Sequence, residues 1–137
     1  MYVGTVTPRQ AWDALKDDPD AILVDVRAVP EWTFVGVPNL APIGKDVLKL
    51  SWRVFPTMQV NENFINQLQE HVQDKQAKLF FICRTGGRSH EAAEAATEAG
   101  YTHCYNVVDG FEGPVDEERH RGVIAGWKAE GLSWEQN

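Results

Sequence analysis

The sequence contains little of several features that would point to particular classes of protein. Its 137 residues include only two cysteines, Cys83 and Cys104, too few for a disulfide framework and consistent with free thiols in a reducing compartment. No apolar stretch approaches the roughly 20 residues that a membrane-spanning helix needs. The first residues, MYVGTVTPRQ, have neither the basic start nor the apolar core of a signal peptide. We therefore expect a cytoplasmic protein.

Positive charge is also scarce. The chain has 13 lysines and arginines against 20 aspartates and glutamates, which gives a formal net charge of −7 and a pI near 5.0. An acidic surface repels phosphate backbones and anionic headgroups, so we expect neither nucleic acid nor a membrane as partner. The four histidines lack the spacing of metal ligands, so we expect no metal. Hydrophobic residues make up 43% of the chain, which suits one domain over residues 1–137.

Local patterns predict alternating strands and helices. A hydroxyl at Thr7, a proline after it and a glutamine three residues beyond the cap predict a helix that ends near Lys16. Continuous apolar runs predict strands that are buried on both faces, over residues 21–26, 78–82 and 103–108. Apolar or alanine residues at helical spacing predict further helices over residues 64–72, 88–99 and 122–130.

Two segments carry more detailed expectations. In the last predicted helix, we expect Val123, Ile124 and Trp127 to face inward. Residues 27–56 hold four of the seven prolines, so we expect an irregular connection with one short strand or helical turn near residues 47–52.

The alternation of strands and helices indicates an α/β fold with a central parallel sheet and helices on both faces. Such sheets place their working residues beyond the carboxyl ends of the strands, where Asp25, Cys83 and Asp109 are expected to lie. Cys104 is near the start of its strand, about 15 Å from that edge. We therefore expect that the two thiols do not pair and that Cys104 is a small buried hydrophobic residue.

The segment richest in chemistry is CRTGGRS, residues 83–89, between a predicted strand and a predicted helix. Its glycines permit a tight turn that directs backbone N–H groups inward, and the helix N-terminus adds positive potential. These groups stabilise negative charge, so we expect Cys83 to be a thiolate nucleophile. The residues expected to form this anion cradle and bind a substrate are Arg84, Thr85, Gly86, Gly87, Arg88 and Ser89.

Some of these residues have a second interpretation. Arg88 is unfavourable near a helix N-terminus, which favours a role with anionic donors, whereas Arg84 is either a steering residue or simply solvated. For Ser89, a helix cap is the first expectation and contact with the donor the second.

The upstream acidic and aromatic residues are less specific. We expect Asp25, Arg27 and Glu31 to form a hydrogen-bond and ion-pair network that braces the loop edge, with an acid–base set as the alternative. The aromatic residues expected near this edge either line a pocket or pack in the core, and the sequence leaves this open for Trp32, Trp52 and Phe111.

Three elements, in the same order along the chain, resemble the rhodanese family of sulfurtransferases in its single-domain bacterial form. They are Asp25-Val26-Arg27 followed by Glu31-Trp32, the loop 83–89 as the pattern Cys-x-x-Gly-x-Arg-Ser, and Asp109-Gly110-Phe111 in place of the family's Gly-Gly-Phe. The segment GVPNLA, residues 36–41, replaces the family's frequent Gly-His-Ile-Pro-Gly-Ala, which implies a different pocket wall.

The resemblance implies a thiosulfate sulfurtransferase-like enzyme. A sulfane sulfur would pass from an anionic donor such as thiosulfate to Cys83, and from the resulting persulfide to cyanide, a small thiol or a protein acceptor, without a cofactor. Phosphatases and arsenate reductases with similar loops have five residues between cysteine and arginine, whereas four separate Cys83 from Arg88. A non-catalytic or redox-sensing binding module with the same fold is the other alternative.

Overall fold

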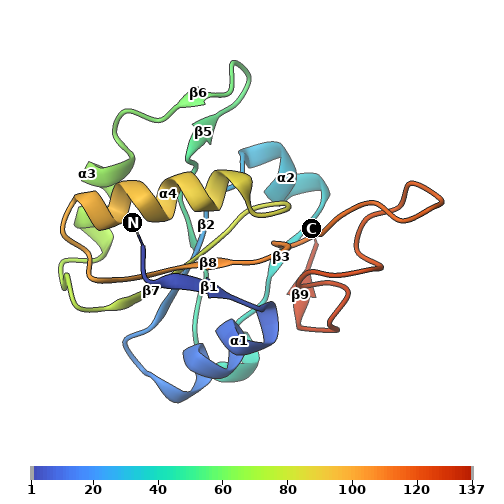
Figure 1. Ribbon diagram of the computed structural model, residues 1–137, viewed down its shortest axis with the longest axis horizontal. Coiled ribbons are helices and arrows are strands. Elements are labelled where there is room, and N and C mark those ends of the chain that lie inside the picture. The colour runs from blue at the N-terminus through green and yellow to red at the C-terminus, as the bar shows by residue number, and fades with distance from the viewer. Residues whose placement is uncertain (1, 137) are drawn as a thin grey trace.

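The computed structural model describes residues 2–136, and its centre is a five-stranded sheet in the order β1-β8-β7-β2-β4 (Figure 1). Every neighbouring pair in this sheet is parallel, which confirms the predicted fold class. The strands are β1 (Gly4–Val6), β2 (Ile22–Asp25), β4 (Leu48–Lys49), β7 (Lys78–Ile82) and β8 (His103–Val107).

Helices cover both faces of the sheet, as predicted. In Figure 1, α1 (Pro8–Asp17) lies below the sheet, and α3 (Phe64–His71) and α4 (Gly87–Glu98) lie above it. Successive residues of the central strand, β7, pack on opposite faces of the sheet. Phe80 belongs to the apolar cluster that includes residues of α1, and Phe81 belongs to the cluster that includes residues of α3 and α4. This is why the strand reads as a continuous apolar run.

The predicted helix signals act as expected at α1 and α4. The Thr7 hydroxyl accepts a hydrogen bond from the Gln10 backbone N–H at 3.1 Å, and the Gln10 side chain accepts one from the Thr7 backbone at 2.9 Å. The alanine face of α4, including Ala92 and Ala96, is fully buried against the sheet. No helix among residues 2–136 is long and apolar enough to cross a membrane.

The proline-rich connection after β2 contains more structure than expected. It includes α2 (Val29–Phe34), β3 (Val37–Pro38), a short 3₁₀ helix (Ala41–Ile43) and β5 (Arg53–Val54), besides β4 in the predicted place. The chain beyond β5 forms β6 (Gln59–Val60), which pairs with β5, and β9 (Trp134–Glu135), which pairs with β3. The N-cap residue of α2 is Ala28, which has no side-chain oxygen to cap the helix, and the Glu31 carboxylate accepts the Ala28 N–H at 3.1 Å.

The predicted helix over residues 122–130 is wrong. Gly122 and Gly126 have φ angles of +82° and +106°, which lie outside the α-helical region. The segment instead packs on the turn after β8, where the Trp127 backbone N–H donates to the Gly110 carbonyl at 2.8 Å. Trp127 is buried as expected, whereas Val123 and Ile124 are exposed.

Candidate active site

Cys83 follows β7 directly, at the carboxyl edge of the sheet, and its side chain is 1% exposed. Its Sγ accepts a hydrogen bond from the Gly86 backbone N–H at 3.1 Å and lies 3.2 Å from the Ser89 hydroxyl oxygen. Gly86 has a φ of +116°, a conformation that glycine adopts without strain and that turns its N–H toward the sulfur. The loop therefore folds around the thiol.

The α4 helix begins at Gly87, so the sulfur lies beside the N-terminus of a helix of 12 residues. The unpaired N–H groups and the dipole at such an end favour negative charge. Arg84, Thr85 and Gly87 are exposed around the buried sulfur. The setting is suited to an anionic sulfur and to an anionic ligand above it.

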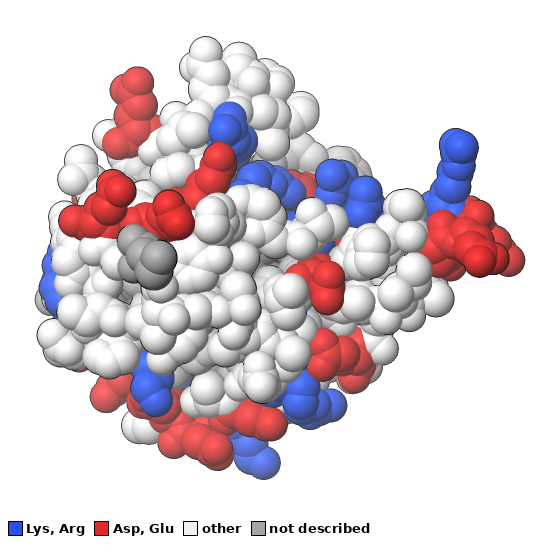
Figure 2. Space-filling view, viewed as in Figure 1, with Lys and Arg blue, Asp and Glu red and all other residues white. Residues whose placement is uncertain are grey.

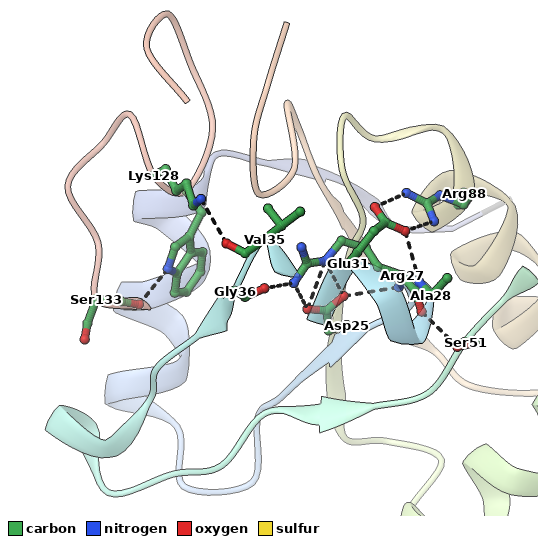
Figure 3. Close-up of polar contacts among 11 residues, drawn as sticks. Asp25, Arg27, Ala28, Glu31, Val35, Gly36, Ser51, Arg88, Lys128 and Ser133 are labelled. Atoms are coloured by element: carbon green, nitrogen blue, oxygen red, sulfur yellow. Dashed lines mark hydrogen bonds and ion pairs between the residues drawn. The ribbon is translucent and has the colours of Figure 1, made fainter. Parts of the chain in front are cut away.

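Arg88 is bound by Glu31 of α2. Its two terminal nitrogens donate to the two Glu31 carboxylate oxygens at 2.6 and 2.8 Å (Figure 3). Burial disfavours the charged carboxylate, but the Arg88 and Ala28 hydrogen bonds outweigh it and lower the pKa of Glu31. The hydrogen bond to Glu31 raises the pKa of Arg88 despite burial, and the charge of Cys83 adds to this effect.

A hollow of about 370 Å³ lies beside this ion pair. Arg84 lines it and makes no ion pair within residues 2–136, so its guanidinium is available to a ligand. The full lining consists of Glu31, Val35, Met58, Arg84, Arg88 and Glu112.

Asp25 and Arg27 form a second ion pair, which is fully buried. The Arg27 Nε and Nη2 atoms donate to the Asp25 carboxylate at 2.9 and 2.7 Å, and Nη2 also donates to the Gly36 carbonyl at 2.7 Å (Figure 3). The guanidinium carbon lies 4.3 Å from the centre of the Phe111 ring. This pair joins β2, the chain after α2 and the turn after β8.

The sequence does not decide whether Trp32, Trp52 and Phe111 line a pocket or pack in the core. None of the three lines the hollow beside Arg84. Phe111 is fully buried and packs on Arg27. Trp52 is half-buried against Phe64 and donates its indole N–H to Glu91 at 2.9 Å. Trp32 lines a different hollow, of about 240 Å³.

The turn after β8 supports the Cys83 loop through backbone hydrogen bonds. The Phe111 N–H donates to the Cys83 carbonyl at 2.8 Å, and the Glu112 N–H donates to the Arg84 carbonyl at 3.1 Å. Gly110 lies so close to the loop that a Cβ there would be 2.4 Å from the Cys83 carbonyl oxygen. The family-like Asp-Gly-Phe segment therefore fixes the backbone of the loop.

Ser89 does not cap α4, because the N-cap residue is Gly86. The Ser89 side chain is buried, contacts the sulfur and donates to the Asn106 Oδ1 atom at 2.6 Å. Sequence reasoning missed Asn106, although an amide between Tyr105 and Val107, inside the predicted strand, was a usable signal. It is 7% exposed, and its Nδ2 donates to the Gly86 carbonyl at 3.1 Å.

In the register of the two strands, Cys104 of β8 lies opposite Leu79 of β7, and Leu79 is four residues before Cys83. Both cysteines are free, as expected. Burial raises the pKa of Cys104, in line with the predicted role as a buried apolar side chain.

Comparison with known proteins assigns the family. A family model described as the STR4 middle domain matches residues 3–137. The uncharacterized protein RC0915 of Rickettsia conorii is 40% identical over 136 residues, which cover 98% of this chain and 99% of its own. The rhodanese-like domain-containing protein 4 of Arabidopsis thaliana chloroplasts is 26% identical over 132 residues, which are 96% of this chain and 25% of that protein.

Solved structures agree with this assignment. The crystal structure of Rv0390 from M. tuberculosis covers 100% of both chains, with a TM-score of 0.92 and 48% identity. The polysulfide-sulfur transferase of Wolinella succinogenes has a similar fold, with a TM-score of 0.68 and 22% identity over 99% of this chain and 80% of its own. The chain therefore belongs to the rhodanese-like family, in the group that the STR4 middle-domain model describes.

Proposed function

We propose that this protein is a sulfurtransferase in which Cys83 carries the transferred sulfur as a persulfide. The supporting observation is the position of the Cys83 Sγ, which lies 3.1 Å from the Gly86 backbone nitrogen at the start of α4. The positive electrostatic potential of the N–H groups stabilises both the attacking thiolate and the persulfide anion that replaces it. A buried cysteine with only a packing role gains nothing from such a loop.

The reaction balances without an added oxidant or reductant. The Cys83 thiolate attacks the outer sulfur of thiosulfate, the sulfur–sulfur bond of the donor breaks, and sulfite leaves with the bonding electron pair. The outer sulfur of the Cys83 persulfide is then attacked by cyanide or by a thiolate. The new bond forms to the acceptor, and the Cys83 thiolate leaves with the electrons.

The two loop arginines have different roles in this proposal. Both terminal nitrogens of Arg88 are bound to Glu31, whose charge offsets that of Arg88, so Arg88 holds α2 against the loop and does not bind the donor directly. Arg84 is exposed at the hollow and is the guanidinium that meets an incoming anionic donor.

The geometry of Arg88 weighs against phosphatase activity. Binding two phosphate oxygens requires the bidentate donors of an arginine, and these donors are taken by Glu31. Four residues between Cys83 and Arg88 also make a tighter loop, which suits a single sulfur atom.

The test is to incubate the protein with thiosulfate and to measure its intact mass, followed by peptide mapping. We expect the mass of one added sulfur on Cys83, its loss on addition of cyanide with formation of thiocyanate, and no addition to Cys83→Ser. Cys104→Ala is the matched control and should load normally. Hydrolysis of p-nitrophenyl phosphate is measured in parallel.

Two results would contradict the proposal. Phosphatase turnover without sulfur loading would support a phosphatase instead. If the folded protein takes up sulfur from neither thiosulfate nor polysulfide, a non-catalytic binding or redox-sensing role becomes the better explanation.

A further inference from the structure

Asn106 has a buried side-chain amide that hydrogen-bonds to Ser89 and to Gly86, the two residues that contact the Cys83 sulfur. It belongs to β8 and pairs with Phe81 of β7, two residues before Cys83. Its side chain reaches Ser89 and Gly86, and these two residues supply the hydroxyl and the N–H that touch the sulfur. An amide in this place costs stability unless both of its ends are hydrogen-bonded, as they are here.

The hydrogen bonds fix the orientation of this side chain. The Gly86 carbonyl can only accept, so the Asn106 NH₂ group must face it, at 3.1 Å. The Asn106 Oδ1 atom then faces Ser89 and can only accept. Ser89 has one hydroxyl hydrogen and donates it to Oδ1 at 2.6 Å.

We propose that Asn106 is a positioning residue for Cys83, acting through the Ser89 hydroxyl and the Gly86 peptide. While the sulfur carries its proton, the S–H group donates to Ser89 Oγ, whose own hydrogen points to Asn106. When the sulfur is ionised, it competes with Asn106 Oδ1 for that same hydrogen. The Asn106 NH₂ group meanwhile holds Gly86, which keeps the Gly86 N–H on the sulfur.

This inference rests on the proposed role of Cys83 as the nucleophile, but it is tested by the ionisation of the thiol and not by sulfur transfer. Substitution at position 106 leaves the other charges near the loop unchanged. Those charged residues are Arg84 and Arg88 of the loop, Asp25 and Arg27 after β2, Glu31 of α2 and Asp109 after β8.

The first experiment compares alkylation of Cys83 by iodoacetamide as a function of pH in wild type and Asn106→Asp, read by peptide mass spectrometry. A carboxylate at this position cannot donate to the Gly86 carbonyl and adds a negative charge close to the sulfur. We expect alkylation at neutral pH to slow roughly tenfold and its pH midpoint to rise, because a nearby like charge disfavours the thiolate. The exposed Asn66→Asp on α3 adds the same charge elsewhere and should change neither.

The second experiment needs no substitution at position 106. In NMR spectra, the Asn106 side-chain NH₂ signals should move with pH at the same midpoint as Cys83 alkylation, because ionisation of the sulfur redirects the Ser89 hydrogen. In Ser89→Ala this movement should fall to a small fraction. The Asn66 signals, on exposed surface, should stay fixed.

An unchanged pH midpoint in folded Asn106→Asp, or Asn106 signals that ignore the Cys83 titration, would overturn the inference. The same holds if the signals move equally in Ser89→Ala. Failure of sulfur loading with these shifts present would reject the proposed function and leave the positioning role intact.

Discussion

Adding a single methyl group at Gly110 should displace the loop that holds Cys83. Gly110 has a φ of +60°, and a Cβ there would lie 2.4 Å from the Cys83 carbonyl oxygen and 2.6 Å from that of Arg84. These are backbone atoms, which cannot rotate away as a flexible side chain would. Gly110→Ala must therefore shift either the turn after β8 or the loop itself.

The structure gives the expected magnitude and a matched control. The left-handed conformation costs a non-glycine residue about 1–2 kcal/mol, and an added carbon in a closely packed site costs a further ~1–3 kcal/mol. Gly44 has a similar φ of +72°, but a methyl group there would have no neighbouring atom within 4 Å, so Gly44→Ala should lose only the conformational part. The two variants should therefore differ by ~1–3 kcal/mol in the free energy of unfolding.

Urea unfolding followed by tryptophan fluorescence measures this difference by linear extrapolation. Sulfur loading from thiosulfate, measured on the folded variants, should be slowed in Gly110→Ala and unchanged in Gly44→Ala. Equal losses of stability in the two variants, or normal loading in Gly110→Ala, would refute the argument that this glycine is required by the close approach to Cys83.

Three further predictions concern the ion pairs and the second thiol. Asp25→Asn should lower the free energy of unfolding by ~3–5 kcal/mol because it leaves the buried Arg27 charge unpaired, and Asp25→Asn with Arg27→Met should recover most of the loss in urea titrations. The lowered pKa of Glu31 means that its pair with Arg88 contributes stability above pH 4.5, the usual value for this carboxyl, and loses it as the pH falls through the lowered value. Glu31→Gln should remove that part of the acid dependence of the urea midpoint; an identical pH dependence would contradict it. Because burial raises the pKa of Cys104, iodoacetamide should leave this thiol unmodified in the native protein at neutral pH, as peptide mapping can show.

The distribution of charge does not by itself locate the site. Figure 2 shows acidic and basic side chains interspersed over one face of the molecule, with much of that face uncharged. The net charge of −7 describes the whole chain, but the proposed anionic donor would respond to the local positive potential of Arg84 and the α4 N-terminus.

Local signals were sufficient where the neighbouring residues along the chain provide the stabilising contacts. The Thr7 cap, the apolar strand before Cys83 and the alanine face of α4 are all readable within a few residues, and each element forms where predicted. The same principle explains the failure at residues 122–130. Apolar residues at helical spacing predicted a helix there, but the backbone at Gly126 packs so closely on the turn after β8 that a Cβ would lie 3.1 Å from the Gly110 carbonyl oxygen, a contact that no local pattern reveals.

Hydrophobic periodicity and glycine placement act over short range, so the amino-acid pattern alone predicts the parallel α/β architecture and the loop with Cys83 at its start. No local pattern predicts that Arg88 faces Glu31, 57 residues away, or that Asn106 on the next strand holds Ser89 and Gly86; these contacts form only when the chain folds. Buried polar groups must find hydrogen-bond partners wherever folding places them, and packing, not proximity along the chain, selects those partners.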